Sequence, residues 1–291
     1  MVNLINKVKK ITSTSEQEVK KNLKKYVNEI IVIKYGGSAM IDPKLSINFA
    51  RNIQVLINLG IKPIIIHGGG PQINEMLSKI NIKHNFFNGM RITDKKTFNI
   101  VEMVLSGSIN KNISYSLSKN GVNALGLSGI DSQIIIAKKF KKSQNSDPDL
   151  GLVGEPKKIN KLFLLELISK NIVPIIAPIG ANLTGTKFNI NADLTAGFIA
   201  SEMKARRLLM LTDVKGVIDN NNHLISELKI KEVKKLITKK IIYGGMIPKV
   251  KTCIEAVKKG IRASVILDGR VKDAILKELF SDQGVGTLFR E

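Results

Sequence analysis

Short apolar runs rich in Ile, Val and Leu recur along the chain and alternate with longer segments of helical periodicity. This alternation is typical of parallel strands joined by crossover helices. The runs are almost continuously hydrophobic, as expected for strands covered on both faces. They comprise residues 30–35, 62–66, 123–127, 172–177, 208–212 and 263–267. The fold class predicted from this pattern is α/β.

The segments between these runs predict helices of ordinary length. The predicted helices span residues 44–59, 71–80, 95–105, 161–170, 192–204, 230–238, 248–259 and 271–280. Gly60, Gly121 and Gly260 each follow a helical segment and precede a strand, where a left-handed helix stop is favoured. Residues 138–149 are polar and turn-rich, with Asp147-Pro148, and predict an exposed hairpin or loop.

The first 28 residues precede the first strand and form a separate predicted unit. Val19, Leu23, Tyr26 and Val27 recur at helical spacing among Lys and Glu residues. A single apolar stripe on a charged helix needs another surface to cover it, because large exposed apolar patches mark interaction sites. We expect the counterpart helix of a neighbouring subunit to cover it.

Composition argues against nucleic-acid and membrane functions. The net charge is +22, but the lysines are scattered in pairs and only 5% of residues are aromatic, without a stacking motif. A coding bias toward Lys, Ile and Asn accounts for the charge without a partner. The apolar runs are far shorter than the roughly 20 residues that span a bilayer, and the N-terminus lacks the apolar core of a signal peptide. Cys253 is the single cysteine, which excludes an internal disulfide and suits a reducing, cytoplasmic compartment.

Two glycine-rich segments follow the first two predicted strands. Lys34-Tyr35-Gly36-Gly37-Ser38 ends the first strand, and His67-Gly68-Gly69-Gly70-Pro71 ends the second just before a helix. Glycines at the carboxyl ends of parallel strands let backbone amides approach an anion, and a helix N-terminus adds partial positive charge. The two segments together predict a phosphate site. Neither the P-loop nor the Rossmann fingerprint occurs.

Six motifs occur in an order that resembles the acetylglutamate kinases of the amino-acid kinase superfamily. They are Lys34–Met40, His67–Pro71, Asn88–Thr93, Phe188–Asp193, Leu211–Val214 and Gly244–Lys249. The resemblance runs from about Ile30 to the C-terminus. It implies a three-layer αβα sandwich around a mainly parallel central sheet. It also implies an oligomerisation helix at residues 1–28 and a kinase domain at 29–291, with acetylglutamate bound by 29–180 and ATP by 181–291.

The resemblance implies MgATP-dependent phosphorylation of the side-chain carboxylate of N-acetyl-L-glutamate, a step of arginine biosynthesis. That carboxylate is ionised at pH 7, so no general base is needed and catalysis reduces to positioning and charge stabilisation. By the same resemblance Lys34 and Lys249 contact the phosphates, and Asp193 holds both ammonium groups. The glycines implied in phosphate binding are Gly36, Gly37, Gly68 and Gly69.

The remaining site residues are also carried over from the resemblance. Arg91 and Asn189 bind the α-carboxylate, with Gly69 and Gly70 lying against the substrate. Thr212, Asp213 and Gly216 belong to the ATP-side loop. Magnesium sits on the nucleotide phosphates and water, with no dedicated protein site. His67 is interpreted as a hydrogen-bonded scaffold residue, since the reaction requires no acid.

Regulation is likewise an expectation from the resemblance. The extra N-terminal helix is similar to that of the hexameric, arginine-inhibited group, in which arginine binds near this helix and a C-terminal Glu-x-Phe stretch. The matching residues here are Glu278, Phe280, Gly284, Gly286 and Thr287, with a departure at Leu279. Val265 stands where many such members have histidine. The Gly244–Val250 stretch also resembles cyanobacterial and plastid members, some controlled by the PII protein, so PII and a plastid stroma location are further expectations.

Two alternatives stay open at this level. One is a superfamily kinase acting on another carboxylate or acyl amino acid. The other is a catalytically idle, arginine-sensing regulator that retains the fold. The joint presence of Lys34, Asp193 and Lys249 argues against the idle protein.

Overall fold

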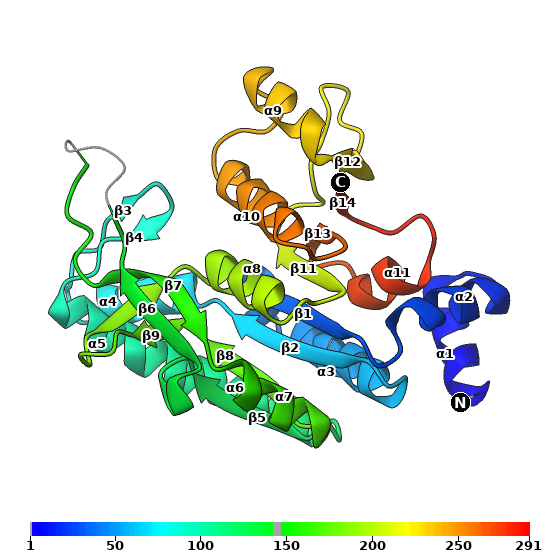
Figure 1. Cartoon of the computed structure of the whole chain (residues 1–291), viewed down its shortest axis with the longest axis horizontal. Coiled ribbons are helices and arrows are strands. Elements are labelled where there is room, and N and C mark those ends of the chain that lie inside the picture. The colour runs from blue at the N-terminus through cyan, green and yellow to red at the C-terminus, as the bar shows by residue number, and fades with distance from the viewer. Residues whose placement is uncertain (1, 142–146) are drawn as a thin grey trace.

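A central, mostly parallel sheet organises the molecule in the computed structural model, which describes residues 2–141 and 147–291 (Figure 1). Its eight strands lie in the order β12-β14-β13-β11-β1-β2-β8-β5, and the six from β13 to β5 are mutually parallel. Those six are β1 (Ile30–Tyr35), β2 (Lys62–His67), β5 (Ala124–Ser128), β8 (Val173–Ala177), β11 (Arg207–Thr212) and β13 (Ser264–Asp268). All six strands predicted from the sequence are therefore confirmed, with ends that differ from the prediction by at most one residue.

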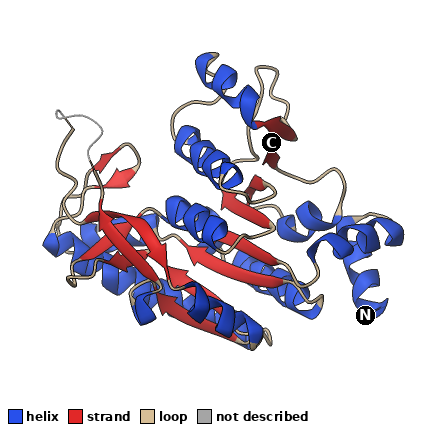
Figure 2. Cartoon of the chain, in the orientation of Figure 1, coloured by secondary structure: helices blue, strands red, loops and turns tan. Residues whose placement is uncertain are grey.

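The other two strands of the sheet, β12 (Glu227–Lys229) and β14 (Thr287–Arg290), extend one edge. β14 runs antiparallel to β13 and parallel to β12. A second, closed group of four strands stands beside the sheet (Figure 2). It comprises β6 (Ile135–Lys139), β7 (Val153–Ile159), β9 (Ile179–Ala181) and β10 (Lys187–Ile190).

Helices cover both faces of the sheet. The molecule is therefore the three-layer αβα sandwich that the sequence resemblance implies. One apolar core contains buried side chains of α3 (Pro43–Asn58), α4 (Gly70–Lys79), α5 (Lys95–Glu102), α6 (Asn110–Lys119) and α11 (Ala274–Phe280). The opposite core contains those of α7 (Lys161–Ser169), α8 (Ala192–Glu202), α9 (Ile230–Thr238) and α10 (Met246–Lys258). Each predicted helix is present, and α9 has the predicted bounds.

Of three local features, two differ from the sequence prediction and one, the hairpin or loop, agrees with it in the described residues. The helix predicted at 95–105 changes into a π-helix at Met103–Ile109, which continues into the unpredicted α6. The hairpin or loop predicted at 138–149 lies between the antiparallel strands β6 and β7, although residues 142–146 fall outside the described part. A short β3–β4 pair, Phe86–Phe87 with Met90–Arg91, carries the Asn-Gly-Met-Arg motif.

The N-terminal segment forms two helices rather than one, α1 (Val2–Thr12) and α2 (Glu16–Tyr26). Ser15 caps α2 by accepting a hydrogen bond from the Glu18 amide. The apolar stripe on α2 is buried within the same chain, because Val19, Leu23 and Tyr26 join the core that contains α11. The Tyr26 ring meets Phe280 edge-on at 6.4 Å. The expectation that a neighbouring subunit must cover this stripe is therefore wrong.

Candidate active site

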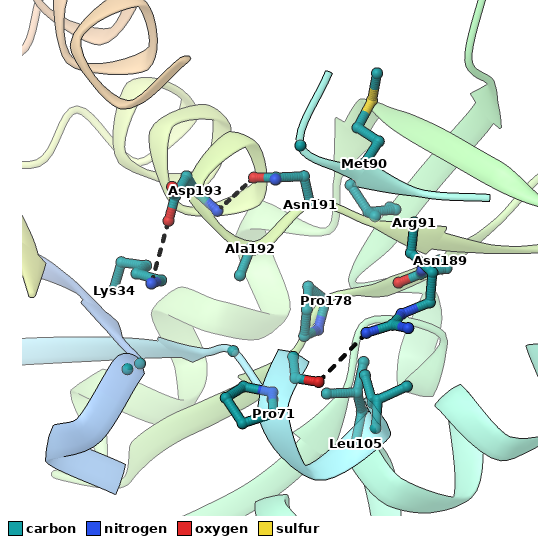
Figure 3. Close-up of a pocket in the computed structure, with 18 of the residues that line it drawn as sticks. Lys34, Pro71, Met90, Arg91, Leu105, Pro178, Asn189, Asn191, Ala192 and Asp193 are labelled. Atoms are coloured by element: carbon teal, nitrogen blue, oxygen red, sulfur yellow. Dashed lines mark hydrogen bonds and ion pairs between the residues drawn. The ribbon is translucent and has the colours of Figure 1, made fainter. Parts of the chain in front are cut away.

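A buried carboxylate, Asp193, lies between two lysines in a pocket of about 440 Å³, and Figure 3 shows its contact with one of them, Lys34. Asp193 Oδ2 lies 2.6 Å from Lys249 Nζ, and Asp193 Oδ1 lies 3.3 Å from Lys34 Nζ. Burial raises the pKa of Asp193, but the two lysines outweigh this and lower the pKa to about 2. Asp193 is therefore ionised at neutral pH and holds the two ammonium groups on either side of one cavity.

Three elements distant in sequence bring these residues together. Lys34 lies near the carboxyl end of β1, Lys249 in the first turn of α10 and Asp193 in the first turn of α8. Asn191 caps α8 by accepting hydrogen bonds from the amides of Asp193 and Leu194 at 2.9 and 3.1 Å. The cap fixes the direction of the helix, and a carboxylate in the first turn is favoured by the helix dipole.

The two glycine segments pack tightly around the pocket. A Cβ at Gly36 would lie 2.6 Å from Lys34 Nζ, and one at Gly69 would lie 2.4 Å from Ile109. Gly37 has φ +71°, and a Cβ there would lie 2.6 Å from Asp213. A larger residue would displace the Lys34 ammonium group at Gly36 and side chains of the π-helix at Gly69, and at Gly37 it would also be strained by the positive φ. The predicted need for glycine therefore has a structural cause at each.

The backbone amides of these two segments form hydrogen bonds with different partners. The Gly68 amide donates to the Tyr35 carbonyl at 2.8 Å, so it ties the second glycine segment to the first. The Ser38 amide donates to Asp213 Oδ1 at 2.8 Å, which ties the first segment to the end of β11. Gly70, by contrast, has open space where a Cβ would stand and faces the cavity.

Arg91 is buried at the other end of the pocket, 6% exposed, and burial lowers its pKa to about 10. Its Nη2 donates to the Gly70 carbonyl at 3.3 Å and to Asn74 Oδ1, and its guanidinium lies 4.6 Å from the centre of the Phe86 ring. Its Nη1 is buried and has no hydrogen-bond partner among the described residues. An unpartnered buried donor beside an open cavity is suited to an anionic ligand.

Asn189 comes from β10 and lies near Arg91 in the pocket (Figure 3). Its side-chain amide donates to Thr93 Oγ1 at 3.2 Å, and Thr93 in turn donates to the Arg91 carbonyl at 2.7 Å. This chain of hydrogen bonds fixes the distance between Asn189 and Arg91. Leu105 and Pro178 line the same region and give it an apolar wall.

His67 is fully buried and belongs to the scaffold, as interpreted from the sequence. Burial lowers its pKa to about 4, so the ring is neutral at pH 7. Its Nε2 accepts a hydrogen bond from Asn110 Nδ2 at 3.1 Å, and its Nδ1 donates to the Gly68 carbonyl at 2.9 Å. Asn110 also donates to the carbonyls of Leu127 and Ile175, so one side chain links β2, β5 and β8.

A second cavity of about 720 Å³ adjoins the first on the C-terminal side, and Thr212 and Lys249 line both. Gly216, with φ +143°, borders this second cavity, whose lining includes Ile218, Tyr243 and Met246. A cleft with both apolar and polar walls that opens onto a lysine and onto the amino end of α10 suits an adenine nucleotide, whose phosphates would reach the first cavity.

The carboxylates at the junction of the two cavities are already engaged. Asp193 pairs with two lysines and Asp213 accepts from the Ser38 amide. The described residues contain no group of three or more His, Cys, Asp or Glu side chains arranged to hold a metal.

The residues expected at an inhibitor site lie next to α2, away from the two cavities. Glu278 accepts hydrogen bonds from the amides of Val285 and Gly286 at 2.8 and 3.2 Å, and burial raises its pKa. Gly284 has φ +63°, and a Cβ there would meet the Glu278 carboxylate at 2.8 Å. The carboxylate is therefore enclosed by its own loop.

None of the helices in the described ranges has the length and apolar character needed to cross a lipid bilayer.

Comparison with known proteins gives the class of this chain. Residues 29–267 match the model of the amino acid kinase family, so the chain belongs to that family. The chain is 49% identical to the acetylglutamate kinase of Pelagibacter ubique over 99% of its own length and 97% of that protein. It is 48% identical to that of Rhodospirillum rubrum, over 92% of its length and 89% of that protein. Within the family, the chain is a member of the acetylglutamate kinases.

Solved structures support the fold. N-acetylglutamate synthase from Neisseria gonorrhoeae superposes with a TM-score of 0.83 at 19% identity, covering 94% of this chain and 62% of that one. Carbamate kinase from Giardia lamblia superposes with a TM-score of 0.65 at 19% identity, covering 90% of this chain and 98% of that one.

Several pocket residues were not identified from the sequence. Asn191 stands immediately before a helix with a carboxylate two residues on, a recognisable cap pattern. Thr93 lies within the Asn88–Thr93 motif but was given no role from the sequence. Leu105, and Asn74 and Asn110, which support the pocket without lining it, gave no signal, because their roles depend on contacts between elements distant in sequence.

Proposed function

We propose that this pocket transfers the γ-phosphoryl group of ATP to the side-chain carboxylate of N-acetyl-L-glutamate. The observation that carries the proposal is the Lys34–Asp193–Lys249 trio between an arginine-lined cavity and the proposed nucleotide cleft. Most of the acceptor side comes from residues 29–180 and the nucleotide side from 181–291, with Asn189 reaching the acceptor cavity from β10.

The two lysines stabilise negative charge and transfer no proton. Negative charge spreads over the oxygens of the transferring phosphoryl group and increases on the leaving phosphate. Lys34 contacts the transferring group and Lys249 the leaving side, and Asp193 keeps both ammonium groups in place before the reaction begins. Magnesium supplies further positive charge on the nucleotide phosphates. The backbone of Gly36, Gly37 and Gly69 lets the phosphates approach closely.

The acceptor is held at its α-carboxylate. Arg91, whose Nη1 has no hydrogen-bond partner among the described residues, and Asn189 line the same cavity, which suits a carboxylate there. The apolar wall with Leu105 suits the acetyl group. Holding the substrate at its distant end orients the side-chain carboxylate toward Lys34.

The decisive experiment measures ADP release with different acceptors. N-acetylglutamate should be turned over far faster than glutamate, aspartate, carbamate or UMP. Comparable turnover of another carboxylate would favour the alternative of a different acceptor specificity. Absence of turnover with every acceptor, in a folded protein that binds arginine, would favour the alternative of an idle arginine-sensing regulator.

The proposed mechanism predicts a flat pH dependence of kcat near neutrality. Asp193 and His67 have pKa values of about 2 and about 4, so both groups are already deprotonated throughout this range. We expect kcat to change less than about twofold between about pH 6 and pH 8. Saturating substrate titrations across that range test this, and an acid limb near pH 6.5 would indicate a general base that the mechanism omits.

The N-terminal helices are proposed to mediate hexamer formation and arginine inhibition. α2 contacts the C-terminal loop directly: Lys21 Nζ lies 2.8 Å from Asp282 Oδ2, Asn22 donates to Asp282 Oδ1 at 3.2 Å, and the Asp282 amide donates to Glu18 at 2.6 Å. An inhibitor bound near Glu278 and Gly284 could therefore bias the position of α2, if it binds one arrangement more tightly. Control by a PII protein stays a prediction from the sequence resemblance.

Deleting residues 1–26 should convert hexamers into dimers and abolish arginine inhibition while substantial kinase activity remains. The substitution Asp282→Ala is the milder test, because it breaks the side-chain contacts with α2 without exposing the core around Phe280. Light scattering and an arginine titration measure both variants. A persisting hexamer, or unchanged inhibition in a dimer, would contradict the role assigned to these helices.

A further inference from the structure

Arginine is scarce in this chain, which has 39 lysines and seven arginines. Lysine and arginine carry the same charge, but only arginine has a planar guanidinium that can form two parallel hydrogen bonds. In a chain so rich in lysine, the positions that hold arginine are therefore candidates for sites that need this geometry. Four of the seven line a single cavity: Arg206, Arg207, Arg262 and Arg290. The other three are Arg91 in the acceptor pocket, Arg270 paired with Asp268, and Arg51 exposed on α3.

The cavity holds about 650 Å³ and lies at the amino-terminal ends of β11 and β13, opposite the ends that carry the reaction pocket. The turn from α10 into β13, the last residues of β14 and Lys25 of α2 complete it. Its volume is in the range of small-molecule sites. The distance along β11 from Arg207 to Thr212 is roughly 16 Å, so this cavity is separate from the reaction pocket.

The cationic side chains of this cavity are incompletely neutralised. Arg290 is paired with Glu227 at 2.6 Å, and Arg207 lies over the Tyr26 ring at 5.7 Å. Arg206 and Arg262 have no ion pair within the described part of the chain. Glu291 is the one acidic side chain in the lining. The cavity therefore carries an excess of positive charge.

One side chain that lines this cavity has a polar atom without a partner. Arg206 Nε is buried and has no hydrogen-bond partner among the described residues. A buried donor without a partner is unfavourable, and an anion in the cavity would satisfy it. The guanidinium fork of Arg206 can bond two oxygens of one phosphate or carboxylate at once.

We propose that this cavity binds a small polyanion with at least two phosphate or carboxylate groups. One group lies between Arg206 and Arg262, and a second lies toward Arg290 and Lys25 at the rim. The residues expected at the inhibitor site, Glu278 and Gly284, do not line this cavity. Arg207 lies close enough to Glu278 for its charge to act on that carboxylate, so the cavity borders the proposed inhibitor region without sharing Glu278 or Gly284, and it is separate from the reaction pocket.

Calorimetric titration of the full-length protein with inorganic pyrophosphate and with citrate tests the proposal, in magnesium-free buffer at fixed ionic strength. The two probes distinguish a phosphate site from a carboxylate site, and saturable binding of either supports the proposal. The reaction pocket can also take pyrophosphate. The comparison is therefore with Arg206→Gln/Arg262→Gln, which alters neither of the two reaction cavities.

We expect the double variant to lose one equivalent of binding or to bind at least tenfold more weakly, whereas Arg51→Gln on α3 binds like the unaltered protein. Arg262 is exposed, so Arg262→Gln alone preserves the fold and should show the same direction of change. ADP binding verifies the reaction cavities in every variant. Identical isotherms for the unaltered protein and the double variant, an equal loss in Arg51→Gln, or binding of neither probe below millimolar concentration would each overturn the proposal.

Discussion

Replacing Lys249 by methionine should lower kcat by about 10²-fold or more. The substitution keeps the length of the side chain but removes a preorganised positive charge from the leaving side of the phosphoryl group, and removal of one such group typically costs 10²- to 10³-fold. Lys34 stays paired with Asp193 at 3.3 Å, so the buried carboxylate keeps one partner. Steady-state kinetics under saturating ATP and acetylglutamate measure the effect.

Lys251 provides the matched control for this experiment. It lies on α10 two residues after Lys249 but is exposed to solvent and does not line either reaction cavity. Lys251→Met should leave kcat within about twofold, because exposed charges away from the site contribute little. Both variants should unfold cooperatively at similar temperatures. Near-normal turnover of Lys249→Met would remove this lysine from the catalytic site.

The central sheet was predictable because its signal is local. The strands β1, β2 and β8 are buried on both faces, so their sequences are nearly continuous runs of hydrophobic residues. The short length of these runs and the glycines beside them distinguish them from buried helices. The two strands at one side of the sheet, β12 at the edge and β14 next to it, were missed. Each has only three or four residues, and alternating burial leaves exposed charges at Glu227, Lys229 and Arg290.

The π-helix and α6 were missed for a different reason. Residues 106–108 are Ser-Gly-Ser, a sequence of low helical propensity that predicts a break. The structure continues through it because Asn110 forms three hydrogen bonds to β2, β5 and β8, and because Leu105 and Ile109 pack against Gly69. Contacts between elements distant in sequence override the local preference. The break between α1 and α2, by contrast, had a readable signal in Ser15 followed by Glu18.

The candidate site also contains residues that the sequence identified and residues that it did not. Glycines and charged residues at strand ends could be identified, since strand order places them at one edge of the sheet. The partners that orient them could not. Asn74 binds Arg91 from α4, and Asp213 holds the Ser38 amide from the end of β11. Neither pairing follows from spacing, because each joins two segments distant in sequence whose approach depends on the whole fold.

Replacing Arg91 by lysine should raise the KM for acetylglutamate by about 10²-fold while the KM for ATP changes less than about twofold. The guanidinium bonds Gly70 and Asn74 with one nitrogen, stacks over Phe86 and leaves Nη1 for the substrate. A lysine has one ammonium group, which cannot keep these contacts and also bind a carboxylate in the same geometry. Losing a hydrogen-bonded partner of a buried charge typically costs 2–5 kcal/mol, which covers the predicted change.

Arg51→Lys is the matched control, because Arg51 is exposed on α3 and lines neither cavity. It should leave both KM values unchanged. The informative result for Arg91→Lys is a large change in the KM for acetylglutamate with little change in the KM for ATP, since a loss of fold would weaken the binding of both substrates. If Arg91→Lys weakened ATP and acetylglutamate equally in a protein with normal thermal stability, Arg91 would not be the carboxylate anchor. The free Nη1 would then need another ligand on the nucleotide side.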